Sequence, residues 1–257
     1  FGANQSSTET DFVVPPFPFP HGGIIFFNEG AGPPVENSIM NSEIIDAAGL
    51  GIFSIASRGA HSQLNVDDCR IEKGKRVKRI DIGIIGGADG PSSQLTIEID
   101  RCTIQGRTSG DGRNILILAA RDAKATAVIE RSKLGPVGQD GVLTTVFGLP
   151  AEISMDIRES VIEDANHTNV ESAILNVPDG DPARVEETKI TIRIENSIIR
   201  NGGHGDDAND HGNISMGSSD IAQQMDPNST APLASGHHQF TLRNSLVTGG
   251  KHFGIGF

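Results

Sequence analysis

An eight-residue pattern that occurs seven times constrains the fold of this chain more than any other feature. In residues 97–104 it reads Ile-Glu-Ile-Asp-Arg-Cys-Thr-Ile, with apolar residues at the first, third and eighth positions and a small residue at the sixth. The small residues of the seven copies are Ser42, Cys69, Cys102, Ser132, Ser160, Ser197 and Ser245. Their spacing, from 27 residues between Ser42 and Cys69 to 48 between Ser197 and Ser245, is typical of solenoid arrays.

The residues of each copy predict a β-strand followed by a corner. Apolar and polar residues alternate in the first half of the copy, as in Ile97, Glu98, Ile99 and Asp100, which is the periodicity of a strand with one buried face. The small residue interrupts the alternation, so the chain is expected to turn there while a small side chain stays inward. The residues three before and two after it are apolar in every copy and are expected to form the core.

This repeat resembles that of the right-handed parallel β-helix superfamily with the pectate-lyase-like architecture, in which small residues or Asn form a ladder at a tight bend between two strands. The resemblance covers residues 35–257 and implies an all-β, right-handed parallel β-helix of about seven coils. A second, apolar strand is expected after each bend, and these strands are expected to form a second sheet. Their ranges are 51–55, 80–85, 114–119, 141–146, 172–177, 212–216 and 252–257.

Residues 1–34 lie outside the repeat and are expected to form an N-terminal cap on the single domain of residues 35–257. A solenoid end exposes unpaired strands and an open core, and the proline-rich stretch 13–20 cannot extend a strand ladder. We expect four phenylalanines to plug the end of the core, namely Phe17, Phe19, Phe26 and Phe27. The alternative is a proline-rich recognition segment.

The charge and hydropathy of the chain limit its partners and location. A net charge of -12 argues against a nucleic-acid partner, and no apolar run reaches membrane-spanning length. The sequence begins with Phe, so we expect a mature product, a fragment or part of a longer chain, and we expect it to be secreted or at the cell surface. The last predicted strand ends at Phe257, which leaves an open edge for another protein or subunit.

Cys69 and Cys102 occupy the same position in consecutive copies and are therefore expected to be neighbours in the ladder. The favoured interpretation is a pair of buried, stacked thiols that replace Ser. A disulfide is the alternative, because Cα atoms in adjacent strands, about 4.8 Å apart, lie within its geometric range.

A glycine-rich loop at residues 201–212 contains the most suggestive ionisable residues. Asp206, Asp207 and Asp210 suit a hard cation such as Ca²⁺, whereas His204 and His211 suit zinc binding or a general-base role. The alternative is that Asp, Asn and Gly simply build a solvated turn.

In enzymes of the resembling superfamily, the site commonly lies on the outer face of one sheet, and polysaccharide lyases use Asp-bound Ca²⁺ with a Lys or Arg base. The residues before the second strands of other coils are Arg113, Asp140, Glu171, and Lys251 or His252, which would form a charged groove. The resemblance therefore makes Arg113 and Lys251 candidate catalytic residues, together with His204 and His211.

Two classes of function follow. The favoured one is a non-catalytic β-helix of a secreted or cell-surface protein, serving as an adhesin-like stalk or binding surface. The alternative is a carbohydrate-active enzyme, a polysaccharide lyase or epimerase, with its site around residues 204–211. The absence of Trp and Tyr weakens the prediction of polysaccharide binding, because their ring faces commonly stack on sugars.

Overall fold

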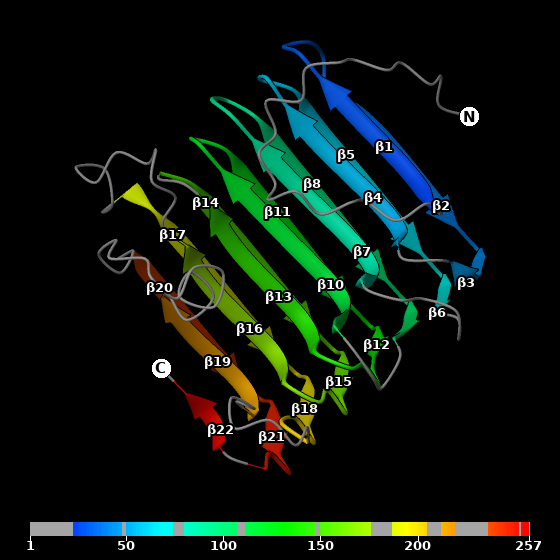
Figure 1. The fold of residues 1–257 in the computed structure, drawn as a ribbon, viewed down its shortest axis with the longest axis vertical. Coiled ribbons are helices and arrows are strands. Elements are labelled where there is room, and N and C mark those ends of the chain that lie inside the picture. The colour runs from blue at the N-terminus through cyan, green and yellow to red at the C-terminus, as the bar shows by residue number, and fades with distance from the viewer. Residues whose placement is uncertain are drawn as a thin grey trace.

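The computed structural model describes residues 23–47, 50–73, 80–106, 111–147, 150–175, 187–204, 212–218, 236–251 and 253–256. In these residues the chain winds through successive coils, and each new coil lies beside the previous one (Figure 1). All strand neighbours pair in parallel, which confirms the predicted parallel β-helix. Within the same residues there is no helix with the length and hydropathy to cross a membrane.

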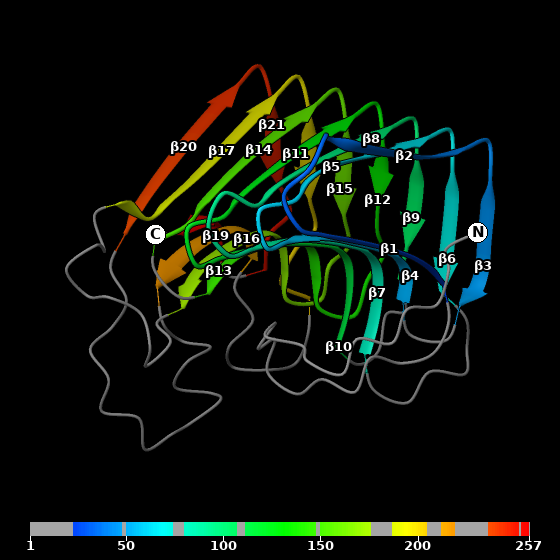
Figure 2. The same cartoon turned by 90° about the horizontal axis from the view of Figure 1, so that it is seen from above.

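Three sheets, each made of parallel strands, surround the core (Figure 2). Sheet A contains β1 (Ile24–Glu29), β4 (Leu50–Ser57), β7 (Ile80–Asp89), β10 (Asp111–Ala120), β13 (Asp140–Phe147), β16 (Thr168–Leu175), β19 (Gly212–Ser218) and β22 (Phe253–Gly256). Sheet B contains β2 (Val35–Met40), β5 (His61–Asp67), β8 (Gln94–Asp100), β11 (Lys124–Glu130), β14 (Glu152–Arg158), β17 (Lys189–Glu195) and β20 (His237–Arg243). Sheet C contains β3 (Glu43–Ala47), β6 (Arg70–Lys73), β9 (Thr103–Gln105), β12 (Lys133–Leu134), β15 (Val161–Glu163), β18 (Ile198–Arg200) and β21 (Leu246–Thr248).

Sheet C is the part of the architecture that the sequence did not predict. Each of its strands begins one residue after the small residue of a repeat and contains the apolar residue that follows, such as Ile104 in β9. These strands are between two and five residues long, so they are too short to show a periodicity of their own. The predicted single bend is therefore a strand between two corners.

The corner between sheets B and C is made by a residue with positive φ just before each small residue. The φ values lie between 46° and 52° for Asn41, Asp68, Arg101, Arg131, Glu159, Asn196 and Asn244. Their amides stay within the ladder, because the amide of Asp68 donates to the carbonyl of Asp100 at 3.0 Å. This left-handed conformation costs roughly 1–2 kcal/mol per residue for a side chain other than glycine, so the stacked coils must hold it in place.

The small residues form the predicted inward ladder. The hydroxyl of Ser160 donates to the Arg158 carbonyl at 2.7 Å and accepts from the amide of Ser132 at 3.1 Å. Cys69 and Cys102 are buried free thiols, which confirms the favoured interpretation of that pair. Burial raises the pKa of the Cys102 thiol to about 12.

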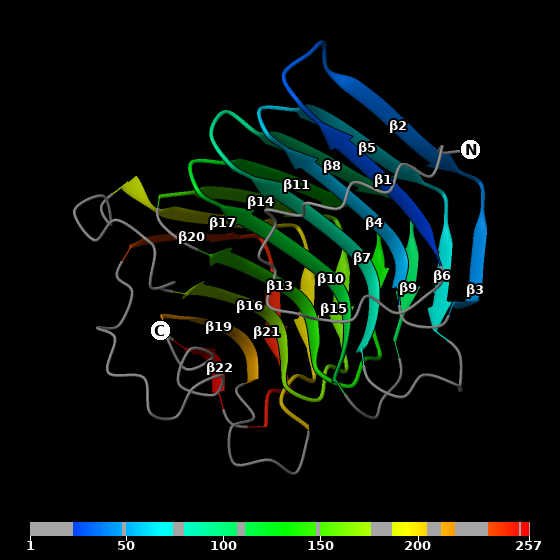
Figure 3. The same cartoon turned by 45° about the horizontal axis from the view of Figure 1, so that its top comes forward.

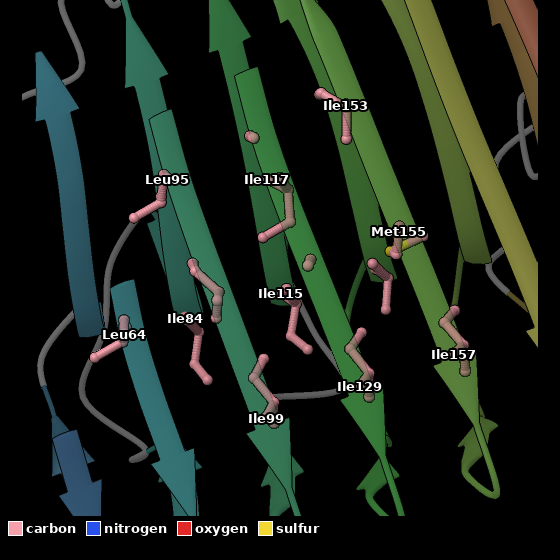
Figure 4. Packing of buried hydrophobic residues seen from close by; sticks show 14 of the residues in the cluster. Leu64, Ile84, Leu95, Ile99, Ile115, Ile117, Ile129, Ile153, Met155 and Ile157 are labelled. Carbon is pink, nitrogen blue, oxygen red and sulfur yellow. The ribbon is translucent and has the colours of Figure 1, made fainter. Parts of the chain in front are cut away.

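The core consists of aliphatic columns that run from coil to coil between the sheets (Figure 4). Ile99 is 1% exposed and lies in register with Val66 and Ile129 on the neighbouring strands. At the N-terminal end, β1 pairs with β4 and extends sheet A. Phe26 packs against the core as expected, but Phe27 is 50% exposed and does not plug it; Phe17 and Phe19 lie outside the described residues.

Candidate functional site

The residues singled out in the sequence fall into three groups. Asp206, Asp207, Asp210 and His211, together with His252, lie outside the described residues. His204 and Lys251 are exposed, and the amide of Lys251 donates to the carbonyl of Gly202 at 3.1 Å. Arg113, by contrast, belongs to a compact group of ionisable side chains on sheet A.

The register of sheet A corrects the expected alignment of the charged residues. Asp140 pairs with Arg113 on one side, as expected, but with Thr168 rather than Glu171 on the other. The reason is that β16 begins at Thr168, four residues before the predicted start of that strand. Lys251 does not belong to this row of paired residues either. Thr168 pairs with Gly212 on the next strand, and Gly212 pairs with Phe253.

A charged cluster, defined as Arg113, Asp140, His167 and Glu171, nevertheless forms at this place. Arg113 Nε donates to Asp140 Oδ2 at 2.8 Å, and His167 Nδ1 lies 2.8 Å from Asp140 Oδ1. The same nitrogen lies 3.2 Å from Glu171 Oε2. The side chains of Arg113 and His167 are each 20% exposed, so the cluster reaches the surface on its cationic side.

Arg113, Asp140 and Glu171 belong to β10, β13 and β16, three strands of sheet A that lie side by side (Figure 3). His167 immediately precedes β16, and its amide donates to the carbonyl of Gln139 at 3.0 Å. Its carbonyl accepts from the amide of Gly212 at 3.2 Å. The strand ladder therefore fixes His167 beside Asp140 of the preceding coil.

Burial and charge shift the three pKa values of the cluster in different directions. Burial raises the pKa of Glu171 to about 7, and the negative charge of Asp140 adds to this shift. For His167, burial lowers the pKa, but the two carboxylates outweigh it and raise the pKa to about 10. Burial also opposes ionisation of Asp140, but Arg113 and His167 outweigh it and hold the Asp140 pKa below its usual range.

This arrangement is capable of two kinds of chemistry. A carboxyl group with a pKa near 7 can take up or release a proton at neutral pH, as a general acid or base must. In addition, Asp140, His167 and Glu171 each offer one ligand atom, and these atoms all lie within 4.8 Å of one another. A divalent metal ion would therefore find three donors in one place.

His167 is the residue that sequence reasoning missed. The sequence nevertheless carries a signal for this site, because Glu171 occupies the row of sheet A that Leu116 and Leu143 occupy in the two preceding coils. A carboxylate that interrupts an apolar row, four residues after a histidine, marks the site.

Comparisons of the chain with protein-family models, with curated proteins and with solved structures give no match.

Proposed function

We propose that this protein is a non-catalytic parallel β-helix of a secreted or cell-surface protein, with the pectate-lyase-like architecture, and that it serves as an adhesin-like stalk or binding surface. One inward row of sheet A carries this proposal. The row runs through Ile24, Ile52, Ile84, Ile115, Val142, Val170, Ile214 and Ile255. Its inner members are 0% exposed, whereas Ile24 and Ile255 at the two ends are 36% and 37% exposed.

This row supports a scaffold because it is suited to continue into a further coil at either end. The exposed large apolar residues of the described coils are all found in the first and last ones, namely Ile24, Ile25, Phe27, Val35, Met40, Ile45, Leu246 and Ile255. Among the described strands, β20, β21 and β22 are the last ones of their sheets, and each pairs with one neighbour. A second copy stacked head to tail would place Ile255 against Ile24 and bury both.

Sedimentation velocity over a range of protein concentrations tests this proposal. We expect the wild type to associate, and we expect Ile255→Lys and Ile24→Lys each to weaken association by placing a charge at the junction. Thr126→Lys, an exposed position on β11, is the matched control and should associate like the wild type. A protein that stays monomeric at every concentration in about 0.15 M salt, where charge repulsion is largely screened, would contradict the proposal.

The charged cluster favours a second candidate, a carbohydrate-active lyase or epimerase. These reactions require a base that removes the proton next to a uronate carboxyl group and a cation that stabilises the charge that develops there. Glu171, with a pKa of about 7, fits the base, and Arg113 fits the cation. Against this candidate, Glu171 is only 7% exposed and Arg113 is already paired with Asp140.

A further inference from the structure

We propose that Asp140, His167 and Glu171 bind one divalent transition-metal ion, of the Zn²⁺ class, through Asp140 Oδ1, His167 Nδ1 and Glu171 Oε2. These residues differ from Asp206, Asp207 and Asp210, at which the sequence suggested a Ca²⁺ site. It is also independent of the proposed scaffold role, because the metal would act within the coils rather than at their ends.

The spacing of the three donor atoms is the first argument. Bonds of about 2.1 Å from one Zn²⁺ ion place its ligand atoms about 3.0 Å apart in octahedral geometry and about 3.4 Å apart in tetrahedral geometry. His167 Nδ1 lies 2.8 Å from Asp140 Oδ1 and 3.2 Å from Glu171 Oε2. These two spacings differ from the values for a zinc ion by a few tenths of an ångström, and all three ligand atoms lie within 4.8 Å of one another.

The second argument is a buried polar atom whose hydrogen-bonding capacity is unused. Glu171 is 7% exposed, and its Oε2 atom has no hydrogen-bond partner. Its contact with His167 Nδ1, at 3.2 Å, is an ion-pair contact without hydrogen-bond geometry. Buried polar side-chain atoms are hydrogen-bonded in the large majority of cases. A buried carboxylate oxygen that has no hydrogen bond and lies within 4.8 Å of the ligand atoms of Asp140 and His167 therefore points to a ligand between them.

The surroundings hold the donors in the orientation that a metal needs. Arg113 binds Asp140 through Oδ2 and leaves Oδ1 for the ion, which is the role of the outer partners that orient metal-binding carboxylates. Thr168 is 0% exposed, and its hydroxyl oxygen lies 3.3 Å from His167 Nδ1, next to the proposed position of the metal ion.

The donor types select the class of metal. Two carboxylates alone would suit Ca²⁺ or Mg²⁺, but an imidazole nitrogen favours Zn²⁺, Fe²⁺ and similar ions. The bound ion would take the position of the proton on His167 Nδ1, because that atom faces both carboxylates. Since its ligands come from two consecutive coils, the ion would join β13 to β16 and stabilise the folded chain by linkage.

Equilibrium dialysis of chelator-treated, metal-free protein against Zn²⁺, with metal counted by mass spectrometry, tests the site. We expect one tight Zn²⁺ per chain and at least about 100-fold weaker binding in Asp140→Asn, His167→Asn and Glu171→Gln. Arg113→Ala, which removes the partner that orients Asp140, should lower the affinity for Zn²⁺ by about 10–100-fold. Glu163→Gln is the matched control, because Glu163 is an equally buried carboxylate, paired with Lys133 and Arg200 on sheet C, and should bind Zn²⁺ like the wild type.

Circular dichroism must show that each variant is folded. His167→Asn supplies a result if a carboxylate variant unfolds, since the His167 side chain is less buried than those of Asp140 and Glu171. Co²⁺ in place of Zn²⁺ gives a second readout, because its visible absorption should change when His167 no longer supplies nitrogen. The proposal is overturned if wild-type protein takes up no Zn²⁺, or if Glu171→Gln and His167→Asn both bind it as tightly as the wild type. Tight binding that disappears only in Asp206→Asn/Asp207→Asn would likewise overturn it.

Discussion

Glu171 on β16 lies in register with Leu143 on β13, so a carboxylate occupies the place of a leucine in one outward row of sheet A. The row continues through Leu116 of β10, and Glu171 is only 7% exposed. Burial is the main cause of the raised pKa of Glu171, and the negative charge of Asp140 is the second. The chain keeps an ionisable group where its own repeat favours an apolar one.

Glu171→Leu restores the apolar row and is expected to leave the thermal stability of the metal-free protein unchanged or higher at pH 6. At this pH most Glu171 carboxyl groups are protonated, since their pKa is about 7, so little charge pairing is lost. Replacement of buried ionic groups by apolar ones of similar volume is often neutral or stabilising. A fall of the melting temperature by more than a few degrees, measured by calorimetry, would show that Glu171 is needed for folding itself.

Ile99→Asp should abolish cooperative folding or cost on the order of 4 kcal/mol or more in the free energy of unfolding. The new carboxylate would enter a row between Val66 and Ile129 that offers it no polar partner. Thr126→Asp, at an exposed position of the same sheet, is the control. Thermal unfolding followed by circular dichroism measures both, and a melting temperature close to that of the wild type would contradict the inward position of Ile99.

Ser160→Ala should lower the free energy of unfolding by about 1–3 kcal/mol in urea titrations. The change removes the acceptor of the Ser132 amide and leaves that buried donor without its partner. The outward-facing Ser154 of β14 provides the comparison, because Ser154→Ala should change stability by less than about 0.5 kcal/mol. If the two substitutions have equal effects on stability, the hydrogen bonds of the serine ladder do not stabilise the corner.

The charge of Glu163 is expected to make the stability of the fold depend on pH in the acid range. Burial raises the pKa of Glu163, but the hydrogen bonds and charges of Lys133 and Arg200 outweigh it and hold the pKa below its usual range. Lys133 Nζ and Arg200 Nε lie 2.8 Å and 2.7 Å from the carboxylate. The ionised group therefore stabilises the fold above the pKa of the unfolded state, about 4.3, and this contribution is lost as the pH falls through the lower folded-state pKa.

Urea unfolding of Glu163→Gln and wild type between pH 2 and pH 7 measures this dependence. The variant should be less stable than the wild type by roughly 1 kcal/mol at pH 7, a modest value because Lys133 and Arg200 are about half exposed. The difference should shrink as the pH falls below about 4. A difference that is constant over the whole range would mean that the charge of Glu163 plays no part.

Much of the fold was predictable because one small residue and two apolar residues recur in every copy. The small residue marks each corner, as at Ser160, and the apolar residues mark the rows of the core. Sheet C was not predictable, since a two-residue strand such as β12 has no periodicity. The left-handed residue at each corner was also missed, because Asp, Arg, Glu and Asn all occur there and the stacked coils impose its conformation.

Less of the candidate site could be predicted. The sequence grouped Arg113, Asp140 and Glu171 correctly as neighbours but placed Glu171 in the wrong row, because the polar start of β16 hides the beginning of the strand. His167 was missed, since its proximity to Asp140 depends on the register between two coils. Only the pairing of β13 with β16 brings the two side chains together.

Proton exchange on uronate polymers in D₂O, followed by NMR, tests most directly whether this β-helix is non-catalytic. A lyase and an epimerase both remove the proton beside the uronate carboxyl group, so either one would produce deuterated sugars or unsaturated chain ends. With wild-type protein, in the presence of Zn²⁺ or Ca²⁺, we expect neither product above the level of a protein-free sample. Products that form with the wild type and disappear with Glu171→Gln, while Glu163→Gln still makes them, would contradict the scaffold role and establish an enzyme.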